Sequence, residues 1–263
     1  MYAALVTLAA IVGILIGSFL NVVIYRVPRG ESVVSPRSHC PACDRPILAR
    51  HNVPIVSYLV LRGRCAYCGD HISPRYPLVE ALTGLMFGAT TAWAVTSGHG
   101  AMLGALLYIV AAGVALAAID LDVHRLPNRI VLPSYPVVAV LLTAAAWSSG
   151  DWWALGRAGI GAVALFAFYL LLVLVYPAGM GWGDVKLAGV LGGVLAYVSW
   201  AALVVGAFAG FVFGAVVAVG LIASRRGTGK TALPFGPFML LGVVAGVVLG
   251  GDIASVYWGV LSA

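Results

Sequence analysis

The stretch YAALVTLAAIVGILIGSFLNVVIY, residues 2–25, decides the class of fold to which this chain belongs. It contains no charged residue, and the first basic side chain, Arg26, follows it directly. A helix that spans a bilayer needs about 20 apolar residues in a row. A cleaved signal peptide carries its basic residues before the apolar run, whereas here they come after it. The stretch therefore predicts a retained first transmembrane helix.

Apolar segments of this kind recur along the whole chain. Of its 263 residues 62% are hydrophobic and only 9% are charged, whereas a soluble domain typically carries about 25% charged residues. The further candidate spans are residues 77–97, 101–119, 130–148, 157–176, 186–198, 200–223 and 235–261. Residues 186–198 are short and glycine-rich, which leaves open a half-span or part of a broken helix. The pattern predicts an all-α polytopic membrane protein with about eight transmembrane helices.

The basic residues predict the orientation of the chain. If the amino terminus lies outside and the spans alternate, the segments that face the cytosol are 26–76, 120–129, 177–186 and 224–234. Of the 15 Lys and Arg residues, only Arg157 falls outside these segments. Cytosolic loops of membrane proteins carry such an excess of basic residues. The net charge of +6 thus reports topology, and we expect lipid around the chain and no nucleic-acid partner.

Residues 26–76 are polar and rich in Arg and Pro, and they contain all four cysteines. These form two Cys-x-x-Cys pairs, Cys40-Pro-Ala-Cys43 and Cys65-Ala-Tyr-Cys68. Two such pairs are typical of a tetrahedral Zn²⁺ held by four thiolates. A reducing cytosol disfavours disulfides, and a segment of about 50 residues has too small a core to fold without a staple. The pattern predicts a small cytosolic zinc-knuckle domain between the first two spans.

Other interpretations of the cysteines are four unrelated thiols, or an iron–sulfur or redox role. His39, His51 and His71 are further possible metal ligands, although four cysteines already fill a tetrahedral site. A full set of four thiolates leaves no open position for water or substrate, so the predicted zinc is structural. Gly69, directly after the second pair, fits a tight turn around the metal.

Two aspartates are predicted at one membrane face. Asp120 stands where the third span reaches the cytosol, and Asp184 stands just before the sixth span, on the same side. Two carboxylates that meet in a low-dielectric site do not both ionise easily, so one holds a proton while the other acts as a base. Such a pair can activate water for attack on a peptide carbonyl and then protonate the leaving amine.

The segment around Asp184, residues 179–186, reads GMGWGDVK. Gly179, Gly181 and Gly183 precede the aspartate at alternate positions. Glycine adopts backbone conformations closed to other residues, or lets another chain approach closely. Non-helical backbone at membrane depth is tolerated only where it is buried in protein or lines a cavity. We therefore expect a loop that holds Asp184 towards a cavity; the alternative is an ordinary loop carboxylate or helix cap.

Several motifs occur together in one order. They are Gly17-Ser18-Phe19-Leu20-Asn21-Val22-Val23 with Tyr25-Arg26-Val27-Pro28, the two cysteine pairs, Arg75-Tyr76-Pro77-Leu78-Val79-Glu80, Ile119-Asp120 with Leu126-Pro127-Asn128, Gly181-Trp182-Gly183-Asp184 with Lys186, and Pro234-Phe235-Gly236-Pro237. In this combination the chain resembles, nearly end to end, the type IV prepilin peptidases, which are also called leader peptidase/N-methyltransferases.

The resemblance implies a membrane aspartic protease of the Gly-x-Gly-Asp class in the bacterial cytoplasmic (inner) membrane. Such enzymes remove the basic leader of prepilins and pseudopilins on the cytosolic side, and Asp120 and Asp184 match their two catalytic aspartates. Many members also methylate the new amino terminus with S-adenosylmethionine, and the form that has the cysteine loop is linked to both activities. Here the loop is compact and no glycine-rich Rossmann fingerprint is present, so the methyltransferase expectation depends on the resemblance alone, and no residue is assigned to the methyl donor.

Four further residues have two interpretations each. Glu80 is either a helix-start carboxylate favoured by the helix dipole or a group that contacts cytosolic arginines, the substrate or the methyl donor. Asp122 is a solvated loop residue or a support for Asp120. Lys186 supports the site or anchors a helix end at the headgroups. Asn21 hydrogen-bonds to a neighbouring helix or takes part in catalysis. Gly181 and Gly183 are expected to support Asp184.

The predicted organisation has three parts: a first helix in residues 1–25, a zinc-binding loop domain in residues 26–76 and a protease core in residues 77–263. A transporter or channel with a regulatory zinc-knuckle domain is the alternative function, because intramembrane acids often mark ion paths. Against it, both aspartates lie at one face and no chain of acids crosses the bilayer. A non-enzymatic assembly protein would have no need of the intact aspartate pair.

Overall fold

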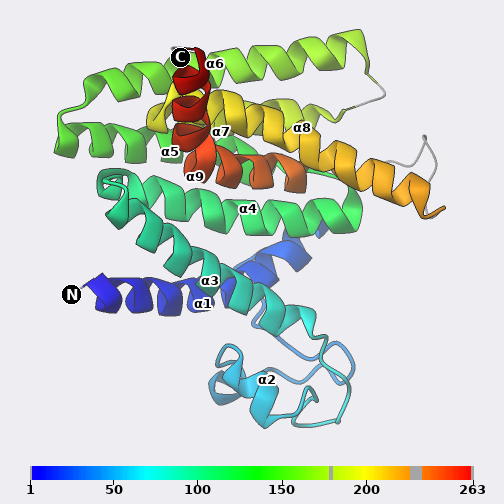
Figure 1. The fold of residues 1–263 in the computed structure, drawn as a ribbon. Coiled ribbons are helices and arrows are strands. Elements are labelled where there is room, and N and C mark those ends of the chain that lie inside the picture. The colour runs from blue at the N-terminus through cyan, green and yellow to red at the C-terminus, as the bar shows by residue number, and fades with distance from the viewer. Residues whose placement is uncertain (1, 178–179, 226–232, 262–263) are drawn as a thin grey trace. The chain divides into compact units, whose positions relative to one another are not determined.

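The computed structural model describes residues 2–177, 180–225 and 233–261, and most of this part is helical (Figure 1). Beyond two isolated bridges, these residues form no strand. Short 3-10 turns occupy Val27–Arg29, Ala49–His51 and Gly100–Met102, and α2 spans only Val56–Val60. The long helices are α1 (Tyr2–Arg26), α3 (Arg75–Thr96), α4 (Leu103–Val123), α5 (Asn128–Ser149), α6 (Trp152–Val175), α7 (Trp182–Val198), α8 (Trp200–Ala223) and α9 (Gly236–Leu261).

The all-α polytopic prediction is confirmed. In the described part, 7 helices are long and apolar enough to cross a membrane. The remaining long helix is α7, which has 17 residues. At 1.5 Å per residue it is roughly 26 Å long, which is close to the lower end of the range for a spanning helix. The weak sixth span is therefore one continuous helix rather than a broken one.

Three predicted helix ends are wrong by four or five residues. The fifth span was expected to begin at residue 157, but α6 begins at Trp152, directly after its N-cap Asp151. The third span was expected to end at residue 119, but α4 continues to Val123. The sixth was expected to begin at residue 186, but α7 begins at Trp182.

At these ends of the third and sixth spans, aspartates mark the predicted loop, and in both cases they belong to a terminal helical turn. In α7 the first turn has free N–H groups whose hydrogen bonds a carboxylate can accept, so Asp184 favours an earlier helix start. In α4 the aspartates lie in the last turn, and the helix ends only where His124 adopts a left-handed conformation with φ 51°.

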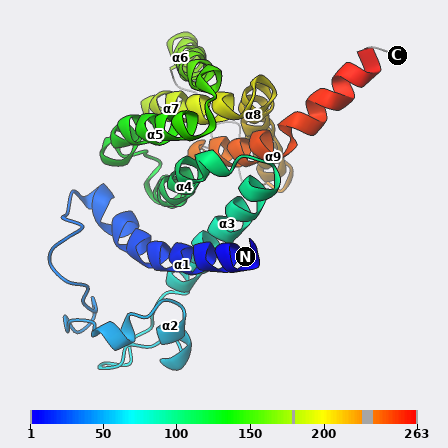
Figure 2. The same cartoon turned by 90° about the vertical axis from the view of Figure 1, so that its left-hand side faces the viewer.

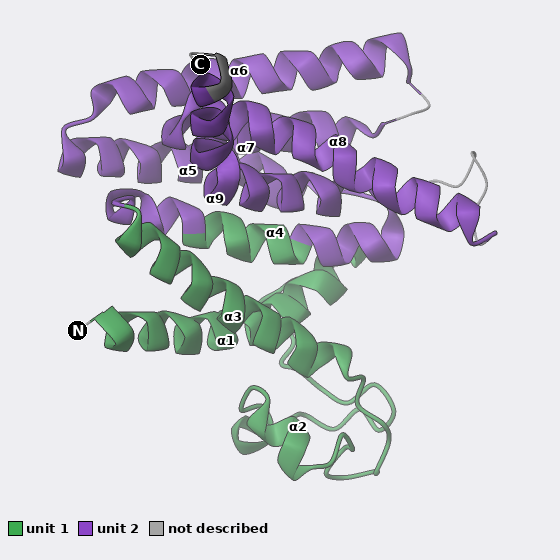
Figure 3. Cartoon of the chain, viewed as in Figure 1, with its two compact units in different colours: residues 1–97, 107–115 green, residues 98–106, 116–263 purple. Residues whose placement is uncertain are grey.

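The chain divides into two compact units, which Figure 3 shows in different colours. Unit 1 comprises residues 1–97 and 107–115, and unit 2 comprises residues 98–106 and 116–263. Unit 1 contains α1, α3 and the loop between them, whereas unit 2 contains α5 to α9 and both ends of α4. The three-part division expected from the sequence, with a boundary at residue 76, stays a prediction.

In unit 1, α1 and α3 run antiparallel and pack closely. Small residues allow the close approach: a Cβ on Gly17 would lie 2.7 Å from the Cα of Glu80. Asn21 Nδ2 donates to the backbone carbonyl of Tyr76 at 3.1 Å, which confirms the expected hydrogen bond to a neighbouring helix. The loop from residue 27 to residue 74, here called the loop module, connects the two helices and contains α2 (Figure 1).

In unit 2, α7 is the central helix and contacts α5, α6, α8 and α9 (Figure 2). Every residue from Leu187 to Tyr197 is buried, and a helix surrounded on all sides can be apolar all round. The pairs α6–α7 and α8–α9 pack most closely, with Gly192 against Gly161 and Gly242 against Gly206. Small residues are common at such interfaces because helices in a membrane associate through close van der Waals packing.

Arg157 of α6, the one basic residue outside the predicted cytosolic segments, has a structural role. Its guanidinium donates to the carbonyl oxygens of Ala196, Tyr197 and Val198, the last two at 2.6 and 3.2 Å. These carbonyls belong to the last turn of α7, which has no intrahelical partner for them. Arg157 thus caps the central helix from a neighbouring one.

Candidate active site and metal centre

Asp120 lies three residues before the end of α4 and is only 5% exposed. Its Oδ2 accepts a buried hydrogen bond of 3.0 Å from the N–H of Gly236. Gly236 is the first residue of α9, so the carboxylate lies at the positive end of that helix dipole. A Cβ at position 236 would lie 2.9 Å from the same oxygen. The glycine is therefore what lets the start of α9 approach Asp120 so closely.

Asp184 lies in the first turn of α7 and is 7% exposed. Its Oδ2 accepts a hydrogen bond of 3.0 Å from the N–H of Gly181, the residue that precedes the helix. The helix-cap interpretation is thus part of what Asp184 does. Its environment resembles that of Asp120. In each case one carboxylate oxygen accepts a hydrogen bond from an N–H at the start of a long helix. Among the described residues, the second oxygen of each has no hydrogen-bond partner.

The two aspartates both belong to unit 2 and are close enough for the charge of Asp120 to act on Asp184. Leu126, in the turn after α4, packs against the backbone near both. A Cβ on Gly183 would lie 2.8 Å from the Cβ of Leu126, and one on Gly236 would lie 3.1 Å from its Cδ2. The ends of α4, α7 and α9 therefore converge on one point. A water molecule that contacts both free oxygens there would be held between a base and an acid.

The sequence did not point to Tyr169 on α6. This residue is only 2% exposed, and its hydroxyl lies near enough to Asp184 for the two groups to interact electrostatically. The ring packs on Phe211 and Phe235, with centroids 5.5 and 6.3 Å away. This aromatic group closes one side of the aspartate pair with apolar surface. The available signal was a tyrosine in the middle of the otherwise apolar run 158–175.

The glycines before Asp184 have different roles. Gly181 has φ −81° and ψ 150°, which any residue can adopt, so the expectation of an unusual backbone does not apply to it. Gly183 is required by the close approach of Leu126. Gly179 lies outside the described residues, as do Arg226 and Lys230 of the predicted cytosolic segments.

The other predicted supporting residues do not all lie at the aspartate pair. Lys186 Nζ donates to Asn128 Oδ1 at 3.0 Å in an exposed hydrogen bond. Asp122 is exposed in the last turn of α4. Glu80 belongs to unit 1, where it is 7% exposed and its Oε2 accepts the N–H of Ile55 at 2.7 Å.

The four cysteines come together in the loop module. One sulfur from each lies within 4.8 Å of the others, and Cys40 Sγ and Cys68 Sγ are 3.8 Å apart. Four thiolates around Zn²⁺ at about 2.3 Å place neighbouring sulfurs about 3.8 Å apart in a tetrahedron. The cluster fits a metal ion of this size.

The two Cys-x-x-Cys turns have the same backbone structure. In each, the N–H of the first cysteine donates to the carbonyl five residues later, at 3.0 Å in the first turn and 2.8 Å in the second. The residue after the second cysteine has positive φ in both, 56° at Asp44 and 74° at Gly69. The tight turn expected at Gly69 is present, and Asp44 repeats it. Two matching turns that aim four sulfurs at one point are typical of zinc knuckles.

The thiols differ in how easily they ionise. The N–H groups of Cys68 and Tyr67 lower the pKa of Cys65 to about 6. The N–H of Asp70 also lowers the pKa of Cys68, but desolvation and the neighbouring sulfurs raise it to about 12. A cation between the sulfurs would relieve the repulsion that opposes ionisation of Cys68.

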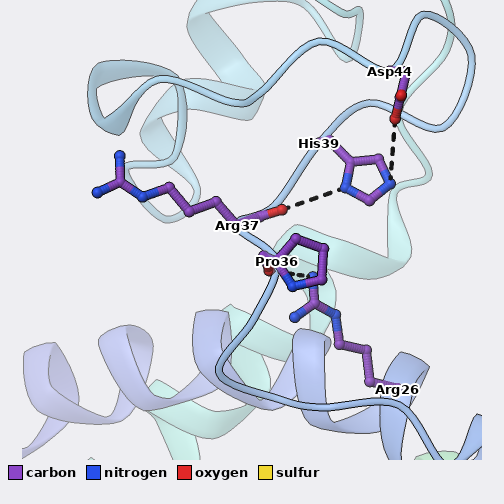
Figure 4. Close-up of polar contacts among 5 residues, drawn as sticks. All are labelled: Arg26, Pro36, Arg37, His39 and Asp44. Carbon is purple, nitrogen blue, oxygen red and sulfur yellow. Dashed lines mark hydrogen bonds and ion pairs between the residues drawn. The ribbon is translucent and has the colours of Figure 1, made fainter.

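The nearby histidines do not join the cysteine cluster in the described residues. Figure 4 shows that His39 points at other partners: its Nδ1 contacts the carbonyl of Arg37 at 3.3 Å, and its Nε2 lies 3.8 Å from Asp44 Oδ1. The same view shows Arg26, at the end of α1, reaching the carbonyl of Pro36 at 2.8 Å. Arg26 thereby ties the module to the helix.

Comparisons with known proteins show similarity along most of the chain. The family model described as Bacterial Peptidase A24 N-terminal domain matches residues 11–94, and that of the Type IV leader peptidase family matches residues 105–219. Proteins named prepilin leader peptidase/N-methyltransferase are similar over most of their length. The one from Stutzerimonas stutzeri is 34% identical over 97% of this chain and 94% of its own, and that from Pseudomonas putida is 35% identical over 95% and 93%. The one from Neisseria gonorrhoeae is 39% identical over 81% of each. No solved structure matches the chain significantly.

Proposed function

Because this chain belongs to the type IV leader peptidase family, we propose that it is an aspartic endopeptidase that removes the basic leader of prepilins or pseudopilins. Asp120 and Asp184 are the catalytic pair in this proposal. The observation that carries it is the matched state of the two carboxylates: both are buried, each is fixed by one helix-start N–H, and each has a second oxygen that no described residue binds.

The reaction needs one proton shared between the two side chains. The ionised carboxylate removes a proton from a water molecule, and the resulting hydroxide attacks the carbonyl carbon of the scissile bond. The protonated carboxyl polarises that carbonyl and then gives its proton to the leaving amine. The N–H groups of Gly181 and Gly236 orient the reacting oxygens, and the two helix starts stabilise the negative charge that remains.

The site faces the cytosol in this proposal, with the amino terminus of the chain outside a bacterial cytoplasmic membrane. The support is the distribution of Lys and Arg, because all but Arg157 fall in segments on the same side as Asp120 and Asp184. Arg157 is the exception because its side chain caps the last turn of α7. A leader with basic residues would stay on that side for the same reason.

The second proposed activity is methylation of the new amino terminus, as in the names of the relatives. S-adenosylmethionine supplies the methyl group in this reaction. Zn²⁺ is the ion that we assign to the four cysteines, because a closed set of four thiolates suits it and leaves no position for catalysis. Its role is then to fold the loop module.

The test is co-expression with a prepilin, followed by mass spectrometry of the product. Asp120→Asn and Asp184→Asn each replace the ionisable carboxyl group with an amide. The amide oxygen can still accept the hydrogen bond from the helix-start N–H. We expect cleavage to fall by roughly 100- to 10,000-fold, because each variant removes the acid or the base. Asp252→Asn, at an exposed position of α9, is the matched control and should cleave as the wild type does.

Normal cleavage by either catalytic variant would remove that aspartate from the mechanism. An intact leader with the wild-type protein, and with a second prepilin, would contradict the peptidase proposal and return attention to the transporter alternative. That alternative gains nothing from the described residues, where the only buried acids are Asp120, Asp184 and Glu80.

A further inference from the structure

A cavity with a volume of about 650 Å³ lies within unit 1. Its walls come from the last turns of α1, the first turns of α3 and the loop module between them, and Cys40 and Cys65 of the metal cluster line part of it. Sites for drug-sized ligands have volumes of about 300–1,000 Å³. The aspartate pair belongs to the other unit, so the proposed peptidase reaction leaves this cavity without a role.

Two buried charges of opposite sign line the cavity. Glu80 is 7% exposed and Arg26 is 8% exposed. Glu80 uses one oxygen for the N–H of Ile55, and Arg26 donates to the carbonyls of Ser32 and Pro36 at 3.0 and 2.8 Å. In the described part of the chain neither has an ion-pair partner. A buried charge is costly unless an opposite charge meets it, so each is suited to a charge on a ligand.

The remaining wall has groups that suit a planar, polar ring. Tyr58, Tyr67 and Tyr76 line the cavity, and His51 stands edge-on to Tyr67 at 6.1 Å. His51 Nδ1 is buried without a hydrogen-bond partner in the described structure. An orphaned buried nitrogen of this kind is normally satisfied by a bound group.

The backbone beside Glu80 is strained, which also points to a binding site. Ile55 has φ 60°, although it is β-branched and such residues strongly avoid this region. Its N–H is the one that Glu80 accepts. Strained residues of this type cluster at ligand sites, where the surrounding structure holds them in place.

We propose that this cavity binds the methyl donor, S-adenosylmethionine, and this inference depends on the proposed methyltransferase activity. Glu80 binds the positive end of the donor, its α-ammonium and sulfonium groups. Arg26 binds the α-carboxylate, and the tyrosines with His51 receive the adenine ring. A zwitterion joined to a planar base offers a partner to Glu80, Arg26 and His51 at once, whereas a basic leader peptide would leave Arg26 unpaired.

The first measurement is the affinity of purified, zinc-loaded, full-length protein for S-adenosylmethionine by isothermal titration calorimetry, with no prepilin present. Glu80→Gln is the informative variant, because the amide oxygen still accepts the N–H of Ile55 while the charge is lost. We expect its Kd for the donor to rise by roughly 10- to 100-fold, the usual effect of a lost charge-assisted hydrogen bond. Asp252→Asn should bind as the wild type does, and cleavage of a prepilin should be unchanged in both.

A second variant tests the location without touching either charge. Val53 lines the cavity and its side chain is 45% exposed, so Val53→Trp adds bulk there. Donor binding should be lost while zinc content and cleavage persist. Wild-type affinity in Glu80→Gln or in Val53→Trp would overturn the assignment.

Phosphatidylethanolamine carries a similar pair of charges and is the competing ligand to exclude. Its addition in micelles should leave the donor Kd unchanged; a wild-type protein that binds this lipid at the cavity and not the donor would overturn the proposal. Because the titration needs no substrate, its failure is distinguishable from failure of the peptidase reaction.

Discussion

The two units of this chain each hold buried carboxylates against backbone N–H groups, but those N–H groups come from different kinds of structure. In unit 2 they belong to Gly181 and Gly236, at the starts of helices of 17 and 26 residues. In unit 1 the N–H belongs to Ile55, directly before a helix of five residues. Unit 2 fixes its acids through packed membrane helices, whereas unit 1 fixes Glu80 through a loop whose four cysteines we propose to bind a structural metal ion. Loss of the metal should therefore reach Glu80 and spare Asp120 and Asp184.

The largest expected effect comes from breaking the metal site. Cys40→Ser should remove zinc from the protein and unfold the loop module, since binding of structural zinc contributes roughly 10–16 kcal/mol in small zinc domains. Metal content, measured by plasma mass spectrometry, should fall from one ion per chain to none. Methylation should be lost and cleavage retained.

The matched control for the metal site is His39→Ala, because His39 lies beside the cluster and binds Asp44 and the carbonyl of Arg37 instead. It should keep its zinc. If Cys40→Ser lost both cleavage and methylation, the aspartate pair of unit 2 would depend on the metal site of unit 1, which would contradict the prediction.

An intermediate effect is expected where helix ends meet in unit 2. Gly183→Ala would place a Cβ 2.8 Å from the Cβ of Leu126, so that the first turn of α7 must shift. We expect cleavage to fall between about 10- and 100-fold, since displacement of a catalytic group by about 1 Å has effects of this size. The double variant Gly183→Ala with Leu126→Gly restores the space and should recover most of the activity.

Gly156→Ala is the control for that pair, because a Cβ at this position of α6 meets no atom within 4 Å. Alanine favours a helix more than glycine does, so this variant should be as stable and as active as the wild type. If the double variant were no better than Gly183→Ala alone, steric contact with Leu126 would not be the reason for the glycine.

The smallest effect is expected at the far end of α7. Arg157→Lys keeps the charge but loses the planar guanidinium, whose Nε and Nη2 donate to different carbonyls of α7. We expect a loss of roughly 1–3 kcal/mol in the free energy of unfolding, which lowers the Tm by several degrees in a thermal melt in detergent. Cleavage at moderate temperature should be unchanged. The exposed Arg129→Lys is the control, and an equal Tm for both variants would show that the cap adds no stability.

Much of this arrangement is determined by the sequence alone, because the relevant signals are local. The length of each apolar run sets the number of spans, and the Cys-x-x-Cys spacing sets two turns that aim sulfurs at one metal. The parity of the spans predicts that Asp120 and Asp184 lie on one side of the membrane. None of these inferences needs to know which helix packs against which.

Only the tertiary structure decides what each polar group contacts. The N–H that fixes Asp120 comes from Gly236, 116 residues further along the chain, and no local pattern connects them. In the sequence, Tyr169 is one residue of an apolar helix, and only the packing of that helix shows that it lies near Asp184. Arg157 looks like an exception to the charge rule until α6 meets the end of α7. The cavity around Glu80 likewise exists only where α1, α3 and the loop module fold together. Burial and hydrogen bonding depend on contacts between distant segments, which is why the sequence names the reacting groups and the fold determines how they are held.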